Sequence, residues 1–245
     1  MNGQVITIKE LLEAGVHFGH RARRWNPKMK PYIFGRKNDI FIIDLEKTLE
    51  YLRKACDVVR RTVEMGQDIL FVGTKPQAKP IIEEEAKRCG AFYVNERWVG
   101  GLFTNFEVVS KRIHRMIELE RLLSAERLDG YTKKERLNLE REYKKLYKIF
   151  NGVREMDRLP GILYVVDVVR EATPIAEARR MKIPIVAMID TNGDPEKVDY
   201  PIPSNDDALR SIKLITKLIA DSVLEGKKGF EDLEAQSATE EESEV

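Results

Sequence analysis

Five short apolar runs alternate with amphipathic segments along most of this chain. The runs are IFII (40–43), DILFVG (68–73), AFYV (91–94), GILYVVD (161–167) and IPIVAMID (183–190). Strands that read as unbroken apolar runs and are separated by helices form a parallel sheet that is covered on both faces. Amphipathic helices are predicted at 44–65, 75–89 and 205–224, with Asp44 and Ser204 as N-caps of the first and the last. The sequence therefore predicts a three-layer α/β domain.

Residues 104–157 interrupt this alternation, because they contain no strand pattern. Thr132 with Glu135 matches the S/T-x-x-E capping box that opens a helix, and Asp129 and Gly130 before it mark a chain reversal. We predict an antiparallel coiled-coil hairpin inserted in the α/β domain, with Glu120 as a polar exception in its seam. The apolar seam is spaced mostly at three and four residues and consists of Val109, Ile113, Met116, Leu123, Leu139, Tyr143, Leu146, Phe150 and Val153.

The C-terminal end is strongly acidic. Residues 229–245 hold seven acids and no base, so the rest of the chain carries a formal charge of +8 although the whole carries +1. A segment this charged and this poor in apolar residues cannot offset its ordering entropy and is predicted to be disordered. The expected domains are an α/β domain at 1–103 and 158–226, a coiled-coil hairpin at 104–157 and a disordered acidic tail at 227–245.

Cysteine usage and hydropathy indicate where the protein works. Cys56 and Cys89 lie in predicted helices without C-x-x-C spacing, which favours a reducing compartment over a zinc ribbon or a disulfide framework. No apolar run reaches the ~20 residues that a membrane-spanning helix needs. We expect a soluble, cytoplasmic protein with no membrane partner.

The loops that follow the strands carry no complete catalytic motif. GTKPQAKP (73–80) fails the pattern G-x-x-x-x-G-K-[ST], and neither G-x-G-x-x-G nor G-x-S-x-G occurs. Lys75 could still meet a phosphate at the following helix N-terminus, where backbone donors favour anions. An enzyme that binds a phosphorylated small ligand near Gly73, Lys75 and Asp190 is the alternative from another functional class.

Histidines and aspartates near the carboxyl edge of the sheet form a candidate metal site. His17 and His20 stand in an H-x-x-H pattern, and imidazole together with carboxylate suits zinc. Loop and helix-capping roles explain the same residues without a metal, and no cofactor is expected to be required. The candidate ligands for a divalent cation, zinc or magnesium, are His17, Asp190 and Asp206, with Asp194 and Asp207 nearby in DTNGDP and SNDDA.

The segment HFGHRARRWNPKMKPYIFGRK (17–37) carries seven bases and no acid. Two prolines and a glycine prevent one regular helix, so the segment is predicted to be an extended basic loop. An anionic polymer along the loop would relieve the repulsion among its charges, with phosphates on the bases and nucleobases stacked on Trp25, Tyr32 and Phe34. A solvated charged surface is the alternative. The RNA-binding candidates here are Arg21, Arg23, Arg24, Trp25, Lys28, Lys30, Arg36 and Lys37.

A second candidate surface is NERWVGGLFTN (95–105). Arg97 and Trp98 stand there beside Gly100 and Gly101, where another backbone could approach closely. The hairpin adds further bases, but glutamates among them dilute the signal. These bases are Arg136, Arg141, Lys144, Lys145 and Lys148.

Four long motifs together resemble one known family. They are LLEAGVHFGHRARRWNPKMKPYIFGRKNDIFIIDLEKT, FVGTKPQAK, ERWVGGLFTNF and LPGILYVVDVVREATPIAEARRMKIPIVAMIDTNGDP. In this order, from about residue 5 to residue 225, the chain resembles the ribosomal protein S2 family of the bacterial small (30S) subunit. The resemblance implies a Rossmann-like (flavodoxin-like) parallel sheet with an inserted coiled-coil hairpin.

The resemblance also implies a function. It implies a structural protein without enzymatic activity that binds 16S ribosomal RNA and bridges the head and body of the subunit. Expected partners are neighbouring small-subunit proteins, including the large mRNA-binding protein built of repeated OB domains, and no DNA. A protein-docking module that works through the hairpin is a further alternative. Carried over residue by residue, the family's basic motif falls on Arg21, Arg23, Arg24, Trp25 and Lys28, and its glycine motif on Trp98, Gly100, Gly101, Thr104 and Asn105; Lys75 and Arg97 complete the RNA-binding candidates.

Overall fold

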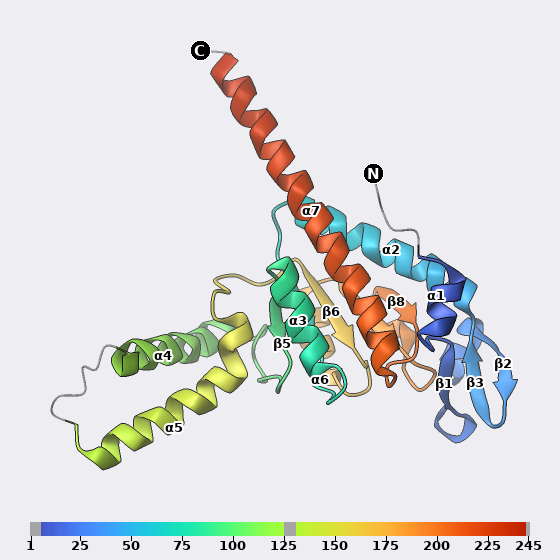
Figure 1. Ribbon diagram of the computed structural model, residues 1–245, viewed down its shortest axis with the longest axis horizontal. Helices are drawn as coiled ribbons and strands as arrows, with labels where there is room; N and C mark the ends of the chain where they lie inside the picture. The colour runs from blue at the N-terminus through green and yellow to red at the C-terminus, as the bar shows by residue number, and fades with distance from the viewer. Residues whose placement is uncertain (1–5, 125–130, 244–245) are drawn as a thin grey trace.

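A five-stranded parallel sheet forms the centre of the protein in the computed structural model, which describes residues 6–124 and 131–243 (Figure 1). The strand order is β5-β4-β6-β7-β8, and every neighbouring pair is parallel. The four apolar runs between residues 68 and 190 are confirmed as strands of this sheet. The strands are β4 (Ile69–Val72), β5 (Phe92–Val94), β6 (Ile162–Val166), β7 (Ile185–Ile189) and β8 (Tyr200–Pro203).

Helices cover both faces of the sheet. On one face lie α2 (Leu45–Glu64), α3 (Lys79–Cys89) and α7 (Leu209–Ser243), and on the other lies α6 (Ala172–Met181) with the base of α4 (Phe106–Ser124). Successive strand residues alternate between the two cores, so Phe71 packs with the first group of helices and Leu70 with the second. The predicted three-layer α/β architecture is confirmed.

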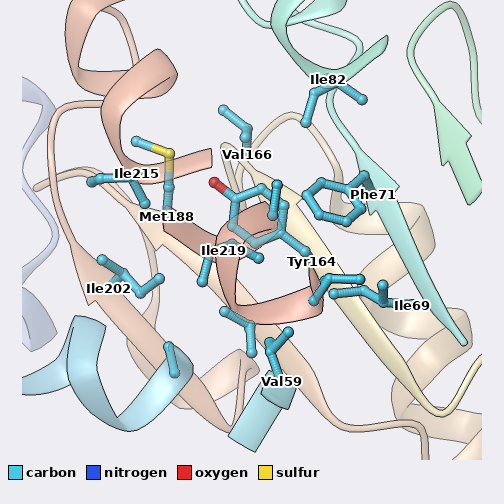
Figure 2. Packing of buried hydrophobic residues seen from close by; sticks show 14 of the residues in the cluster. Val59, Ile69, Phe71, Ile82, Tyr164, Val166, Met188, Ile202, Ile215 and Ile219 are labelled. Atoms are coloured by element: carbon cyan, nitrogen blue, oxygen red, sulfur yellow. The ribbon is translucent and has the colours of Figure 1, made fainter. Parts of the chain in front are cut away.

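Tyr164 of β6 is the largest fully buried side chain of the first core (Figure 2). Its ring meets Phe71 edge-on with 5.2 Å between centroids, and Ile219 of α7 packs beside it. The phenol oxygen lies 3.0 Å from the hydroxyl of Thr216, which satisfies its hydrogen bond inside the core. Burying a large apolar side chain of this kind contributes about 1.5–3 kcal/mol, so this contact ties α7 firmly to the sheet.

The fifth strand of the parallel sheet differs from the prediction. The run at 40–43 is not in this sheet, and β8 takes the place that the prediction gave to it. Pro201 and Pro203 make β8 hard to recognise as a strand from the sequence, because proline cannot donate a backbone hydrogen bond to a neighbouring strand. An edge position tolerates both prolines, since β8 pairs only with β7.

A separate three-stranded antiparallel sheet contains the run at 40–43. Its order is β1 (Phe18–Arg21), β3 (Ile40–Ile43) and β2 (Ile33–Lys37), and it lies beside α1 (Ile8–Glu13) (Figure 1). Asn38 and Asp39 form the turn between β2 and β3 with positive φ angles of 49° and 65°. Two such residues in a row make the hairpin turn that joins antiparallel strands, and asparagine and aspartate tolerate this conformation.

Two helices, α4 and α5 (Lys133–Phe150), lie in the region for which an insertion is predicted, and they project away from the parallel sheet (Figure 1). Thr132 caps α5, and the capping box with Glu135 is confirmed. Glu120 accepts hydrogen bonds from Tyr143 at 2.9 Å and from Arg154 at 2.8 Å, which explains a polar residue in the seam. The predicted reversal at Asp129 and Gly130 lies outside the described residues. Coiled-coil packing between α4 and α5 stays a prediction.

The C-terminal helix is longer than the prediction of 205–224. It begins at Leu209, because the side chain of Asn205 accepts from the backbone N–H groups of Asp207 and Ala208 and so shapes a turn before it. Ser204 is not its cap, since its hydroxyl donates to the carbonyl of Ile202. α7 continues to Ser243, past the domain boundary predicted at 226, and disorder of 227–245 in solution stays a prediction.

Candidate nucleic-acid interface

The basic segment at 17–37 is folded, so the prediction of an extended loop is wrong. β1 leads into two short 3-10 helices, Ala22–Arg24 and Pro27–Tyr32, and then into β2. Met29 is fully buried in the core of the α/β domain, which fixes the middle of the segment. The 3-10 turns satisfy part of the hydrogen bonding of the backbone, while the basic side chains are exposed. Helix or strand periodicity in the sequence does not reveal such an arrangement.

Five of the candidate bases in this segment are exposed and form no ion pair with a carboxylate in the described part of the chain. Lys54 and Lys87, by contrast, each form an ion pair with a glutamate on a helix surface. Arg24 acts on an acid only from a distance, since its charge helps to lower the pKa of Asp207. Such unpaired cations close together repel one another, so they favour an anionic ligand. These bases are Arg21, Arg23, Arg24, Lys30 and Lys37.

Two other candidates in the segment are already paired. Lys28 reaches across to the 3-10 helix Pro195–Lys197, where its Nζ lies 3.0 Å from Asp194 and 2.5 Å from Glu196. The hydrogen bonds that its ammonium donates to Glu196 and Asp194 raise the pKa of Lys28. Arg36 forms an ion pair with Asp39 in the turn that follows. Both side chains are exposed, but their charge is partly offset within the protein.

The aromatic residues of the segment are divided between the core and the surface. Trp25 is half-buried against Phe41, with 5.0 Å between ring centroids, and its Nε1 is buried without a partner among the described residues. Tyr32 meets Tyr51 edge-on at 5.3 Å. Phe34 is 80% exposed and keeps a free face. Phe34 is therefore the aromatic side chain of this segment that is best placed to stack on a ligand.

Thr191, which follows β7, anchors the basic segment to the parallel sheet. Its hydroxyl accepts from the N–H of His20 at 2.8 Å, and its carbonyl accepts from the N–H of Asn26 at 2.8 Å. Gly19 lies so close that a Cβ there would be 2.5 Å from the methyl of Thr191. The basic surface is thus built directly on the carboxyl edge of the sheet.

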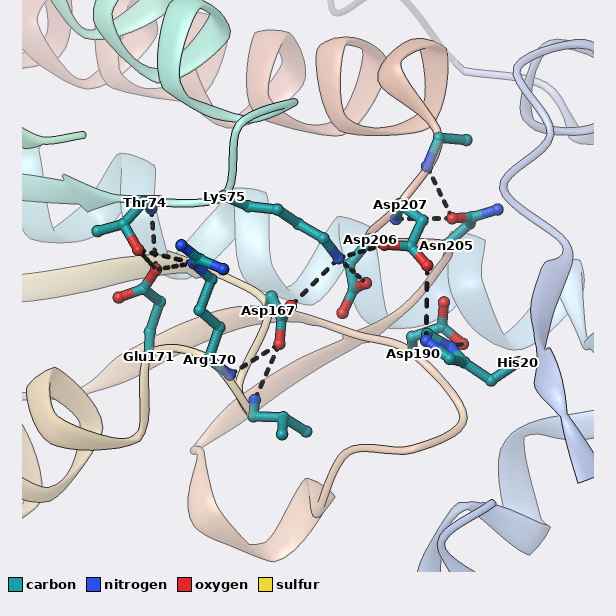
Figure 3. Close-up of polar contacts among 12 residues, drawn as sticks. His20, Thr74, Lys75, Asp167, Arg170, Glu171, Asp190, Asn205, Asp206 and Asp207 are labelled. Carbon is teal, nitrogen blue, oxygen red and sulfur yellow. Dashed lines mark hydrogen bonds and ion pairs between the residues drawn. The ribbon is translucent and has the colours of Figure 1, made fainter. Parts of the chain in front are cut away.

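A cluster of charged side chains lies at this same edge (Figure 3). The ammonium of Lys75 lies 3.1 Å from Asp167, 2.7 Å from Asp206 and 2.5 Å from Asp207. Burial lowers the pKa of Lys75, but the surrounding carboxylates outweigh burial and raise it. Burial and the neighbouring carboxylates of Asp190 and Asp167 raise the pKa of Asp206 to about 8. Lys75 is therefore committed to internal carboxylates rather than free to meet a phosphate.

The turn that carries Lys75 is tightly packed rather than a phosphate cradle. A Cβ on Gly73 would lie 2.9 Å from Ile82 of α3. Thr74 donates from its N–H at 2.8 Å and from its hydroxyl at 2.6 Å to the buried carboxylate of Glu171. These contacts pack the residues after β4 closely, so GTKPQAKP forms a tight turn into α3.

The predicted metal ligands do not converge. Asp190 and Asp206 belong to the charged cluster, whereas His17 lies in an apolar groove with Ile8 and Phe34. His20 is the histidine beside the cluster, with Nδ1 3.0 Å from Asp190, and the spacing H-x-x-H could not show which of the two would reach it. Within residues 6–124 and 131–243, no group of three or more histidine, cysteine or acidic side chains is placed to hold a metal ion. Binding of zinc or magnesium stays a prediction.

The second candidate surface, residues 95–105, surrounds a buried carboxylate that the sequence analysis missed. Glu177 of α6 accepts from the indole Nε1 of Trp98 at 3.0 Å and from the N–H groups of Gly101 and Phe103 at 2.8 and 3.0 Å. Burial raises the pKa of Glu177, but these hydrogen bonds and those of Thr104 together lower it below its usual range. Trp98 is only 8% exposed, so its part in this surface is structural, while Arg97, Thr104 and Asn105 are exposed.

Comparison with known proteins identifies the family. A match to the family "Ribosomal protein S2" spans residues 11–226. The chain belongs to the ribosomal protein S2 family. It is 52% identical over 234 residues to "Small ribosomal subunit protein uS2" of Fusobacterium nucleatum, with 95% of each chain covered. It is 55% identical over 222 residues to the protein of the same name from Dictyoglomus turgidum, with 91% of this chain and 90% of the relative covered.

Membership of the ribosomal protein S2 family decides between the classes of function. Members are structural components of the small ribosomal subunit and not enzymes, so the alternative of an enzyme for a phosphorylated ligand is wrong. The exposed basic segment, the charged cluster and the loop on Glu177 are accordingly features of a protein that works in an assembly. Among the described residues, no helix is long and apolar enough to cross a membrane.

Proposed function

We propose that this chain binds 16S ribosomal RNA in the small subunit mainly through the basic segment at 17–37. The observation that carries the proposal is the set of five exposed cations that form no ion pair among the described residues, Arg21, Arg23, Arg24, Lys30 and Lys37. Each phosphate contact releases counterions, so such a surface binds RNA with an affinity that falls steeply with salt. Phe34 beside these bases adds an exposed ring for stacking.

The proposed role includes a bridge between the head and the body of the subunit. The antiparallel sheet with the basic segment and the α4–α5 hairpin lie at opposite ends of the long axis of the molecule (Figure 1). Arg112 and Lys145, which form no ion pair with any described residue, line a groove between α4 and α5. Two separated basic surfaces on one chain support contact with two regions of RNA, with the hairpin acting as a coiled-coil arm.

Protein partners belong to the same proposal. An exposed apolar groove of about 340 Å³ runs between α1 and the antiparallel sheet, and Ile8, Leu12 and Ile42 are among the residues that line it. Exposed apolar side chains gathered in one groove are typical of protein contacts. We assign this groove to a neighbouring small-subunit protein, in particular the large mRNA-binding protein of repeated OB domains. The assembly would work in the cytoplasm, without DNA or membrane.

Salt-dependent binding of purified protein to 16S ribosomal RNA tests the proposal. The triple variant R21A/R23A/R24A should lower the slope of log K against log[salt] by about 0.7 to 0.9 for each lost phosphate contact. The matched control is K54A/K87A/K213A, which removes the same charge from lysines that are each paired with a glutamate on a helix surface. If both triple variants change the slope equally, the basic segment is not the RNA-binding surface.

A further inference from the structure

Residues 97–105 form a loop that is buried on one side and exposed on the other. Trp98, Leu102 and Phe103 are each at most 8% exposed, and Trp98 meets Phe103 edge-on with 5.0 Å between ring centroids. Arg97 and Thr104, which flank these residues in the sequence, are exposed, and Arg97 forms no ion pair with an acid in the described ranges of the chain. The buried side therefore holds the loop while the exposed side remains available to a ligand.

The buried side of the loop is organised by one carboxylate. Oε1 of Glu177 accepts from Trp98 Nε1 and from the N–H of Gly101, and Oε2 accepts from the N–H of Phe103 and of Thr104, the last at 3.2 Å. The hydroxyl of Thr104 donates to Oε2 as well, at 3.3 Å. All five groups donate hydrogen bonds, so this position requires a side chain with two terminal acceptor atoms, as in a carboxylate. Glutamine would turn an NH₂ group toward at least two of the donors.

Apolar burial alone does not fix the conformation of this loop. Gly101 has a φ of +92°, a region that glycine enters without strain, and its N–H points to Glu177. The carbonyl of Gly101 accepts from the N–H of Asn105 at 2.8 Å, and the carbonyl of Asn105 accepts from Val109 at 3.3 Å. α4 thus begins directly after the groups that Glu177 holds, so the carboxylate orients both the exposed loop and the start of the hairpin.

We propose that Glu177 is a positioning residue for RNA binding, which holds residues 97–105 so that Arg97 and Asn105 together meet a phosphodiester backbone. The inference rests on the proposed function, because it takes ribosomal RNA as the ligand. Arg97 supplies the charge, and the side-chain amide of Asn105 supplies a neutral hydrogen bond of the kind that fixes register on a backbone. The hydroxyl of Thr104 donates to Glu177 and so belongs to the buried side of the loop. Glu177 itself is buried beneath the loop and does not touch the RNA.

A double-mutant cycle in the full-length protein tests this inference, with binding to 16S ribosomal RNA measured over a range of salt. In the wild-type background R97A should lower the salt slope by about 0.7 to 0.9, the loss of one phosphate contact. In the E177Q background R97A should lower it by less than half as much, because the loop no longer presents Arg97. R21A, at the far basic segment, should lower the slope equally in both backgrounds.

The outcomes separate this inference from the proposed function. Equal effects of R97A in the two backgrounds, or no effect in either, overturn the role of Glu177 while R21A still supports RNA binding. If R21A does not lower the salt slope in the wild-type background, the proposed function itself is wrong. If E177Q does not fold, W98F replaces it, since this variant removes one of the five donors and keeps an aromatic ring in the core. R97A should then lower the salt slope less in the W98F background than in wild type, with a smaller difference than for E177Q.

Discussion

Lys75 and Arg21 show that the surroundings of a cation decide whether it can serve a ligand. Both are basic residues near the carboxyl edge of the sheet, but Lys75 lies within ion-pair distance of three carboxylates and Arg21 of none in the described part of the chain. The partners of Lys75 come from residues 167, 206 and 207, far away in the sequence. Local sequence pattern could therefore not show that Lys75 is unavailable to RNA.

Replacing Lys75 should destabilise the protein strongly. K75M keeps the length of the side chain but leaves the buried carboxylate of Asp167 without its cation and the buried carboxyl group of Asp206 without its hydrogen-bond donor, a change that costs about 3–5 kcal/mol in the free energy of unfolding. K213M is the matched control, because Lys213 forms an exposed ion pair with Glu84 that contributes about 1 kcal/mol or less. Urea denaturation measures both variants. Equal losses would contradict a structural role for the charged cluster.

The lowered pKa of Glu177 gives a stability effect with a defined pH range. A carboxylate whose pKa is lower in the folded state stabilises that state above its unfolded pKa, near 4.5, and the stabilisation is lost as pH falls through the folded value. The difference in the free energy of unfolding between wild type and E177Q should be constant from pH 6 to 8 and should shrink below about pH 4.5. Denaturation across this range measures it. A constant difference down to pH 3 would mean that the charge of Glu177 is irrelevant.

At the scale of elements, the contact between β1 and the loop after β7 holds the basic segment on the α/β domain. A Cβ on Gly19 would lie 2.5 Å from the methyl of Thr191 and 3.1 Å from the carbonyl of Phe41, so G19A must push β1 away from its anchor. We expect a loss of about 1–3 kcal/mol in the free energy of unfolding. G35A in β2 of the same sheet is the control, because a Cβ there meets no atom within 4 Å. Thermal denaturation should show a loss in G19A alone.

Elements whose signals are local could be predicted from the sequence, and elements that depend on distant partners could not. Asp44 caps α2 and the Thr132 box opens α5 as predicted, since each needs only the next three residues. β8 was missed because its prolines are acceptable only at a sheet edge, a position that depends on the whole topology. β3 was placed in the wrong sheet because an apolar run does not reveal its pairing partner.

In the candidate site too, residues with a local signal could be predicted and residues that depend on distant partners could not. Composition alone marks the basic segment, and five of its bases form no ion pair with a described residue, while RNA binding by this segment stays a prediction. Glu177 was missed because a single glutamate in an amphipathic helix, 73 residues or more from the donors it accepts from, has no local signature. A surplus of backbone donors in a glycine-containing loop is the signal that could have prompted a search for such an acceptor.

For the molecule as a whole, charge is distributed unevenly between the basic surfaces and the acidic C-terminal end. Residues 235–245 contain four acids, Glu240, Glu241, Glu242 and Glu244, and no base, so their removal raises the formal net charge from +1 to +5. Because long-range attraction to a polyanion depends on the summed charge, truncation after Glu234 should raise the rate of association with 16S ribosomal RNA several-fold at low salt. At 1 M salt, where the screening length is about 3 Å, the difference should vanish.

A second variant separates charge from the mere presence of the segment. Changing the same four glutamates to glutamine keeps the length of the chain and produces the same formal charge of +5. If electrostatic repulsion is the cause, stopped-flow association rates of the two variants should coincide at every salt concentration, because the field that guides encounter depends on charge and not on contacts. An increase in the truncated protein alone would show that the segment covers the RNA-binding surface sterically, and no increase in either would mean that the acidic end does not influence encounter.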